Sequence, residues 1–113
     1  MKTHTLVFRQ IDRANFTAIK DGLKTVETRA ATVRHRDIKA GDTLVIKCGK
    51  DSTIKTVQDV RHFASIDDLL RAIPIQNVMP FATTKAGVER EYYSCPGYKE
   101  KIEQHGIIAL TLN

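Results

Sequence analysis

The sequence predicts an α+β domain built on a small, mostly antiparallel β-barrel flanked by short helices. The chain has 113 residues, of which 42% are hydrophobic, so it can bury a core of its own. Segments with strand-like alternation are interleaved with segments of helical spacing, one after the first strand and the rest before the last strand. The strands are short and the last follows a long helical stretch, which favours a closed barrel because closure removes exposed edges. A ferredoxin-like sandwich is the alternative, and in either case we expect residues 1–113 to form a single domain.

Alternating apolar residues and β-branched side chains mark the strands. We expect strands over residues 4–9, 25–30, 43–48, 52–63 and 107–112. Gly49 is expected to turn the chain between the third and fourth strands, because glycine readily takes a positive φ. The fourth strand is long enough to contain a bulge.

Apolar residues at helical spacing, with capping residues before them, mark the helices. We expect helices over residues 13–21 and 65–73, from Thr83 or Thr84 to about Tyr93, and over residues 98–105. Asp12 and Ser65 are the expected N-caps of the first two helices. Pro74 and Pro80 enclose a segment that we expect to be irregular.

Cysteine content and hydropathy indicate a cytoplasmic location. The chain has only two cysteines, Cys48 and Cys95, which favours a reducing compartment over a disulfide framework. No signal peptide is visible at the N-terminus. No apolar run approaches the ~20 residues that span a bilayer, so we expect no membrane association.

Positive charge is concentrated in the first half of the chain. Residues 1–61 contain 13 Lys/Arg and 7 Asp/Glu, a net charge of +6, whereas residues 62–113 contain 5 and 6, a net charge of −1. A polyanion such as RNA is therefore a plausible partner for the first half. The alternative is a basic, soluble surface without a partner.

Several kinds of chemistry lack their sequence signals. There is no glycine-rich phosphate loop or nucleotide fingerprint. The four histidines are scattered and no cysteine lies at metal-ligand spacing, so we expect neither a metal nor another cofactor. Cys95 would need a distant histidine beside it to act as a nucleophile.

One short segment, residues 22–29, concentrates charge beside a turn. Lys24, Glu27 and Arg29 lie within six residues, and on a strand Glu27 and Arg29 point to the same side while Val26 points to the other. Val26 can therefore enter the core while the two charged residues face a groove, with Lys24 at the mouth of the strand. An ordinary solvated strand face with a Glu–Arg pair is the alternative.

This segment resembles the signature of the ASCH domain family. The family pattern is Gly, any residue, Lys, two residues, Glu, any residue, Arg, and this chain has Gly22, Lys24, Glu27 and Arg29 at that spacing. The resemblance continues through the turn at Gly41-Asp42 and through the strand and helix of residues 57–73. It extends to the C-terminal segment of residues 92–110, as in compact prokaryotic single-domain members.

The resemblance implies a PUA-like β-barrel with helices around it and an RNA-related role. It implies a groove beside the signature that holds RNA, a nucleotide or a nucleoside. The basic loop of residues 31–39 follows the signature strand and is expected to contact phosphates, while tyrosines stack on bases. The expected ligand-binding residues are Lys24, Glu27, Arg29, Arg34, Arg36, Tyr93 and Tyr98; Tyr92 is expected in the core.

Some relatives are reported as ribonucleases, and others as amidohydrolases that deacylate acylated cytidine. The amidohydrolases are thought to use a Lys, a Thr three positions later and an acid from the second half. Lys24 matches the first position, but Glu27 occupies the Thr position, and only Glu89 or Glu91 is available as the acid. A carboxylate about 4 Å away would keep Lys24 charged, which suits anion binding better than proton abstraction.

The sequence therefore favours an RNA- or nucleotide-binding domain whose ligand contacts Lys24, Glu27 and Arg29. A metal-independent hydrolase that uses Lys24 and Glu27 as catalytic residues, either a ribonuclease or an acylcytidine amidohydrolase, is the first alternative. A protein-binding adaptor is the second. We expect a monomer, and we expect alanine substitutions of the three charged residues to leave the fold intact, because charges on a groove face contribute little to stability.

Overall fold

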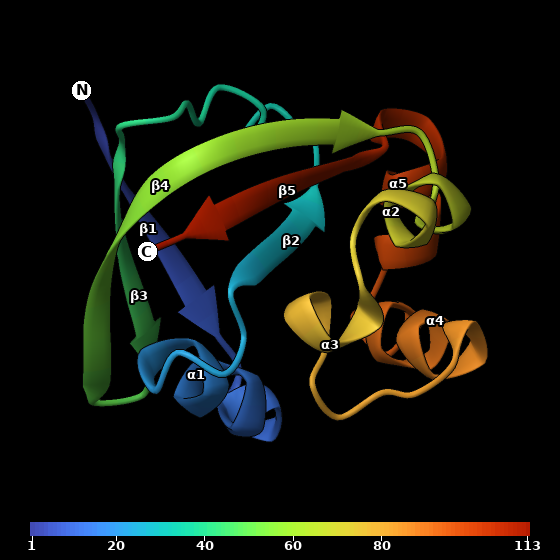
Figure 1. Ribbon diagram of the computed structural model, residues 1–113, viewed down its shortest axis with the longest axis horizontal. Coiled ribbons are helices and arrows are strands. Elements are labelled where there is room, and N and C mark those ends of the chain that lie inside the picture. The colour runs from blue at the N-terminus through green and yellow to red at the C-terminus, as the bar shows by residue number, and fades with distance from the viewer.

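The computed structural model describes residues 1–113, and its five strands form one strongly curved sheet. The strands are β1 (Thr3–Phe8), β2 (Val26–Ala30), β3 (Thr43–Cys48), β4 (Asp51–Phe63) and β5 (Ile107–Leu112). They lie in the order β1-β3-β4-β5-β2, with β1 parallel to β3 and every other pair antiparallel. The predicted mostly antiparallel barrel is confirmed, but it is open, because the end strands β1 and β2 do not pair (Figure 1).

The long strand β4 joins the two halves of the barrel. Its first residues pair with β3 and its last with β5. The register with β5 shifts between Val57 and Asp59, an irregularity of the kind that bends a strand. This bend allows the sheet to curl until β1 and β2 face each other across a gap, which we call the seam.

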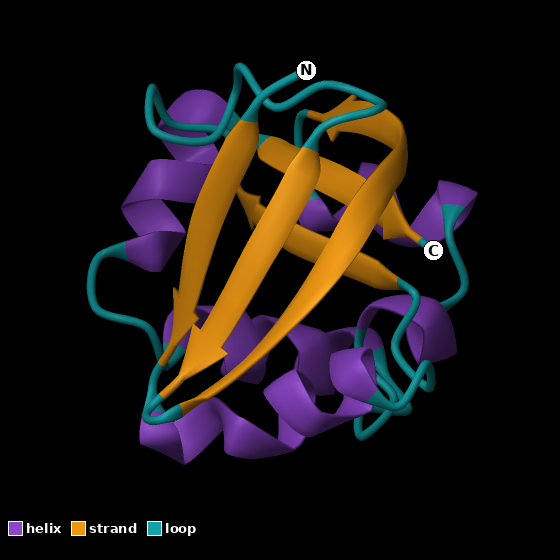
Figure 2. Ribbon diagram, turned by 90° about the vertical axis from the view of Figure 1, so that its left-hand side faces the viewer, coloured by secondary structure: helices purple, strands orange, loops and turns teal.

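Helices lie below the strands and beside β2. They are the 3₁₀ turn η1 (Gln10–Asp12), α1 (Arg13–Lys20), α2 (Ile66–Ala72), α3 (Ile75–Val78), α4 (Lys85–Tyr93) and α5 (Tyr98–His105). Figure 1 shows α2 to α5 gathered on one side, beside β2 and β5, with α1 below the strands. Figure 2 shows that no helix covers the outer face of β1, β3 and β4. None of these helices is long and apolar enough to cross a membrane.

Three of the helix predictions need comment. Ser65 and Thr84 cap α2 and α4, since their hydroxyls accept hydrogen bonds from the backbone N–H groups of Asp68 and Gly87. Asp12 precedes α1 but does not cap it, because its carboxylate pairs with Arg9 instead. The segment predicted to be irregular contains the one-turn helix α3, which is too short to show helical spacing.

Two hydrophobic clusters meet at β5, whose residues alternate between them. The first fills the barrel and includes Leu6, Phe16 and Ile46. The second lies between the strands and the helices and includes Val26, Leu69, Val78, Val88 and Ile102. Because Val26 belongs to the second cluster, the signature strand is fixed against the helices on one side and turns its next residue, Glu27, toward the seam.

Candidate functional site

A cavity of about 200 Å³ occupies the seam between β1 and β2. It is called the seam cavity here and is lined by the following residues: Val7, Phe8, Arg9, Asp12, Asn15, Lys24, Glu27, Thr28, Arg29, Met79, Glu91, Tyr92, Cys95 and Tyr98. These residues come from both edge strands, from α1 and its approach, and from the region of α3 to α5. The cavity therefore exists only because the open barrel brings segments from both ends of the sequence together.

The chain enters the cavity through a tight turn after α1. Gly22 has a φ of +82°, a conformation that glycine tolerates and other residues rarely adopt. The backbone N–H of Lys24 then donates to the carbonyl of Ala18 at 3.0 Å. This bond places the Lys24 side chain over the start of β2, where it points into the protein rather than into solvent.

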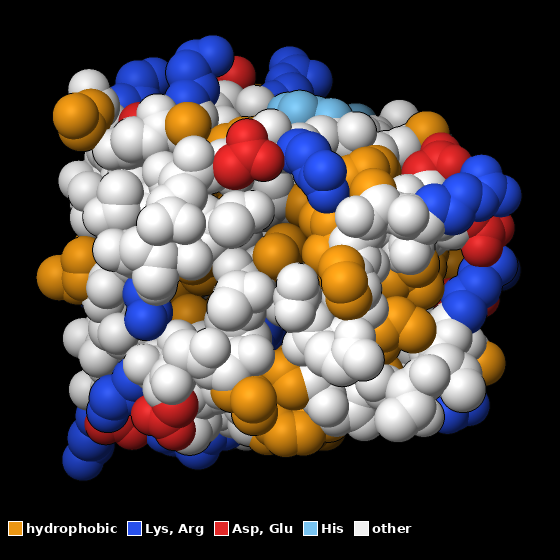
Figure 3. All heavy atoms as spheres, viewed as in Figure 1, with side chains coloured by type: hydrophobic (Ala, Val, Ile, Leu, Met, Phe, Trp, Pro, Cys, Tyr) orange, Lys and Arg blue, Asp and Glu red, His pale blue; other side chains and the backbone are white.

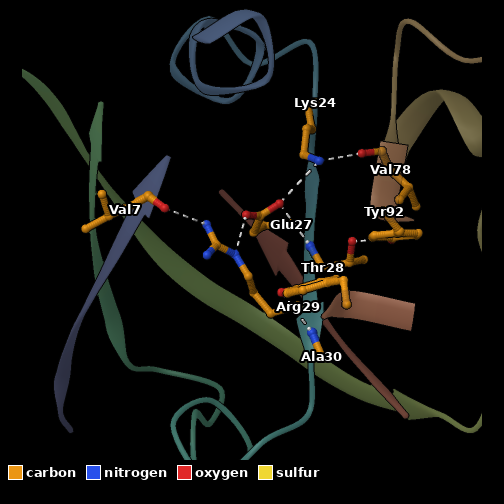
Figure 4. Close-up of polar contacts among 9 residues, drawn as sticks. Val7, Lys24, Glu27, Thr28, Arg29, Ala30, Val78 and Tyr92 are labelled. Atoms are coloured by element: carbon orange, nitrogen blue, oxygen red, sulfur yellow. Dashed lines mark hydrogen bonds and ion pairs between the residues drawn. The ribbon is translucent and has the colours of Figure 1, made fainter. Parts of the chain in front are cut away.

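Glu27 lies between two cations at the floor of the cavity, as Figure 4 shows. Its Oε1 is 3.2 Å from Nζ of Lys24, and its Oε2 accepts from Nε of Arg29 at 3.0 Å. Lys24 also donates to the carbonyl of Val78 at 2.6 Å, and Arg29 reaches the carbonyl of Val7 across the seam at 3.5 Å. The three signature side chains thus form one network with a net charge of +1.

Burial makes this network electrostatically strong. Only 3% of each of the Lys24 and Glu27 side chains is exposed, and 17% of Arg29. Burial by itself raises the pKa of Glu27, but the charges of Lys24 and Arg29, with their hydrogen bonds, hold that pKa below its ordinary value. Burial likewise opposes the charged form of Arg29, and Glu27 raises the Arg29 pKa above its usual range. Glu27 is therefore an ionised acceptor at neutral pH.

Side chains accept hydrogen bonds from backbone N–H groups on the free edge of β2. The backbone N–H of Thr28 donates to Oε1 of Glu27 at 3.0 Å, and the N–H of Ala30 donates to the Tyr98 hydroxyl at 3.2 Å. The hydroxyls of Thr28 and Tyr92 are hydrogen-bonded to each other. These bonds keep another strand from pairing with β2 and hold the edge open as a cavity wall.

Aromatic rings form much of the cavity wall. The Phe8 ring lies 4.9 Å below the Arg29 guanidinium, a cation–π contact that orients the arginine. Tyr92 and Tyr98 stack on each other with ring centroids 6.5 Å apart. Burial raises the pKa of both tyrosines, so both hydroxyls keep their protons at neutral pH.

The mouth of the cavity contains a second charged group. Nε of Arg9 donates to Asp12 at 2.7 Å, and its Nη atoms lie 3.4 and 3.5 Å from the backbone and hydroxyl oxygens of Ser94. Glu91 is exposed beside them, and burial raises the pKa of the Cys95 thiol. The mouth therefore has two acids, Asp12 and Glu91, and one arginine, whereas the network at the floor has a net positive charge.

Four of the seven predicted ligand-binding residues line this cavity: Lys24, Glu27, Arg29 and Tyr98. The basic loop lies at the other end of β2, along the upper edge of the molecule in Figure 1, and Figure 3 shows Lys and Arg side chains along that edge. Its residues Arg34 and Arg36 are exposed and do not line the cavity. Tyr93 lines a separate, smaller pocket with Lys85 and Glu89.

The structure also resolves which acid of the second half is near the signature. Glu91 lines the seam cavity, whereas Glu89 lies with Lys85 in the other pocket. Tyr92 is buried as predicted, but its hydroxyl also reaches the cavity wall. Nothing in the sequence indicated that the site includes Phe8, Arg9 and Cys95. Each becomes part of the site only because β1 and the end of α4 approach β2 in the fold.

The expected position of the charged residues on an accessible groove face holds only in part. Lys24 and Glu27 are buried, so their removal is now expected to destabilise the fold, and Arg29 is the member of the trio most accessible to a ligand. No group of three or more His, Cys, Asp or Glu side chains is placed to hold a metal ion.

The open, mostly antiparallel barrel with a charged cavity in its seam defines a PUA-like α+β domain. The family model described as "ASCH domain" matches residues 10–113, so the chain belongs to the ASCH domain family. Its signature residues are the ones that form the buried network at the cavity floor.

Two solved structures are similar over almost their whole length. The crystal structure of hypothetical protein PH0355 is 25% identical with a TM-score of 0.79, and the match covers 100% of this chain and 98% of that one. The solution NMR structure of protein PF0455 from Pyrococcus furiosus is 22% identical with a TM-score of 0.76, covering 98% and 96%. A search of curated proteins finds no match.

Proposed function

We propose that this protein binds RNA or a nucleotide by holding a single base in the seam cavity. The observation that carries the proposal is the buried Lys24–Glu27–Arg29 network, which places hydrogen-bonding groups at the floor of a cavity with aromatic walls. A base fits this combination, because its faces stack on aromatic rings and its edge forms hydrogen bonds. Membership of the ASCH family, whose role is RNA-related, is consistent with it.

The size and charge of the cavity favour a base over a backbone phosphate as the buried part of the ligand. Its volume of about 200 Å³ is below the roughly 300–1,000 Å³ of sites for drug-sized ligands, so it admits one ring rather than a strand. Its lining contains three basic and three acidic side chains, and Asp12 and Glu91 at the mouth repel a phosphate. Phosphates of a bound RNA would instead contact basic residues outside, such as those of the loop 31–39.

The test is an NMR titration of ¹⁵N-labelled protein with nucleosides, nucleotides and short single-stranded RNA at low salt. We expect the amide signals of Thr28 and Ala30 to shift on binding, because side chains at the cavity hold both N–H groups. If no nucleoside, nucleotide or RNA shifts these signals, the proposed function is wrong.

A hydrolase is the second candidate, and the position of Glu91 is the observation that favours it. Glu91 lines the same cavity as Lys24, so an acid from the second half is available there. Lys24, however, donates to the carbonyl of Val78 and is ion-paired with Glu27, which suits stabilisation of an oxyanion rather than proton abstraction. Assay of the purified protein with acetylcytidine and with RNA tests this candidate.

A further inference from the structure

We propose that the base held in the seam cavity is uracil, recognised through its carbonyl–N–H–carbonyl edge. This inference rests on the proposed function and adds the identity of the base. It follows from counting the hydrogen-bonding positions that the buried network leaves unused.

Lys24 has one N–H left for a ligand. An ammonium group carries three protons. One is donated to the carbonyl of Val78 at 2.6 Å, and the ion pair with Oε1 of Glu27 at 3.2 Å occupies a second. The remaining proton is a donor at the start of β2, on the wall of the cavity.

Glu27 has one acceptor position left and no donor. Its Oε1 already accepts from the backbone N–H of Thr28 and is ion-paired with Lys24, whereas Oε2 accepts only from Nε of Arg29. The two adjacent cations keep the group ionised, so it carries no proton to donate. A ligand must therefore present a donor to Oε2.

Arg29 has donors left beyond Glu27. Its Nε–H is used by Glu27 and one Nη2–H by the carbonyl of Val7, at the long distance of 3.5 Å. The Nη1 protons have no partner in the protein. Because Glu27 lies between Lys24 and Arg29 in Figure 4, the floor presents a donor, an acceptor and a donor in that order.

Among the four bases of RNA only uracil offers the complementary sequence on its Watson–Crick edge, with a carbonyl, an N–H and a second carbonyl. Cytosine would place an unprotonated ring nitrogen against the Glu27 carboxylate, and two acceptors repel. Guanine would point its amino group at a cation. Both mismatches leave buried polar groups without partners, which costs more than the lost hydrogen bond itself.

The experiment compares uridine, cytidine, guanosine and 3-methyluridine in the same NMR titration, with oligo(U) and oligo(C) RNA in parallel. We expect uridine or oligo(U) to bind at least ~10-fold more tightly than the cytosine counterpart, the effect of one unsatisfied buried group. 3-Methyluridine, in which a methyl group replaces the N–H, should lose that advantage. Binding of oligo(U) but not of uridine would assign the uracil to an RNA strand, and binding of uridine would show that the nucleoside suffices.

Equal affinity for the uracil and cytosine ligands, or unchanged affinity for 3-methyluridine, would overturn the uracil assignment and leave base binding intact. Absence of binding by every nucleoside and RNA would overturn the proposed function as well. These two failures are therefore distinguishable.

A matched pair of variants tests the role of Glu27. Glu27→Gln adds an amide donor at the central position and should reduce the preference for uracil to within ~3-fold, whereas Glu89→Gln, in the other pocket, should leave it unchanged. An unchanged preference in a folded Glu27→Gln protein would contradict the assignment. Since this variant removes a buried charge, its ¹⁵N spectrum must first show a native fold; the 3-methyluridine comparison uses the unaltered protein and holds regardless.

Discussion

Lys24 and Glu27 form a buried ion pair three residues apart in the sequence, with Nζ 3.2 Å from Oε1 and 3% of each side chain exposed. The spacing is that of the ASCH signature, and its physical meaning is visible in the structure. The turn after Gly22 brings Lys24 back over β2, where the carboxylate of Glu27 also neutralises Arg29. The signature therefore encodes a network that supports the fold and shapes the cavity together.

Lys24→Met is expected to destabilise the protein by about 3–5 kcal/mol, because it leaves the buried Glu27 carboxylate with one partner fewer. Chemical unfolding measures the loss. Lys85→Met is the matched control, since Lys85 forms an ion pair with Asp67 on the exposed surface, and it should unfold much like the unaltered protein. Equal unfolding midpoints for both variants would show that the Lys24–Glu27 pair contributes little to the fold.

The acid dependence of stability should report Glu27. The folded-state pKa of Glu27 is lowered, so its contribution is fully present above its unfolded pKa of about 4.3 and is lost as the pH falls through the folded value. The difference in unfolding free energy between the unaltered protein and Glu27→Gln should thus be largest at neutral pH and shrink below about pH 4.

Urea unfolding at several pH values measures this difference. Some acid sensitivity should persist in Glu27→Gln, because hydrogen bonds from the backbone of Lys2, from His4 and from the backbone of Lys39 lower the pKa of Asp42 as well. A difference that stays constant from neutral to acidic pH would mean that Glu27 titrates alike in the folded and unfolded states.

Local sequence patterns predicted most of the elements. The strand over residues 43–48, the helix over residues 98–105 and the strand over residues 107–112 have the predicted bounds. Their alternation, their helical spacing and their flanking glycines act over a few positions, which a sequence displays directly. The same holds for the spacing of Gly22, Lys24, Glu27 and Arg29.

The seam was not predictable, because it depends on contacts between distant segments. Nothing in β1 shows that it pairs with β3 in parallel, and hence nothing shows that Phe8 and Arg9 face β2. The sequence also did not predict that Lys24 is buried. Its side chain is held inside by a hydrogen bond to the carbonyl of Val78, which is 54 residues away in the sequence. One prediction from proximity in sequence was misleading. The loop with Arg34 and Arg36 directly follows β2, but it leads away from the cavity.

If RNA binds, the loop arginines should act on its phosphates and not on the base. Arg34→Ala with Arg36→Ala should lower the salt slope of single-stranded RNA binding by about 0.7 for each phosphate that the loop no longer neutralises, and should leave nucleoside affinity unchanged. Anisotropy titrations over a range of salt concentrations measure the slope. The control is Arg71→Ala with Arg90→Ala, which removes the same charge from exposed positions on α2 and α4. It should lower the salt slope less than the loop variant does. Equal slopes for the two double variants would argue against contact between RNA and the loop.

Deacylation of acetylcytidine is expected to be slow or absent in the unaltered protein. The Lys24 ammonium is already shared between the Val78 carbonyl and Glu27, and Glu27 occupies the position where the related amidohydrolases are thought to have a Thr. Loss of the acetyl group from the nucleoside, followed by chromatography, measures the activity. Any activity found should survive a chelator, because no metal-ligand cluster is present.

Glu89 and Glu91 on α4 provide a matched pair of variants for testing such a deacylase activity. Glu91 lines the seam cavity and Glu89 does not, so Glu91→Gln should abolish genuine deacylation while Glu89→Gln leaves it intact. Both changes remove one negative charge from the same helix, so they affect its net charge alike. Fast turnover by the unaltered protein, lost in Glu91→Gln and in Lys24→Met but kept in Glu89→Gln, would make the protein an amidohydrolase. Glu27 would then orient Lys24 toward the oxyanion that forms on the scissile amide.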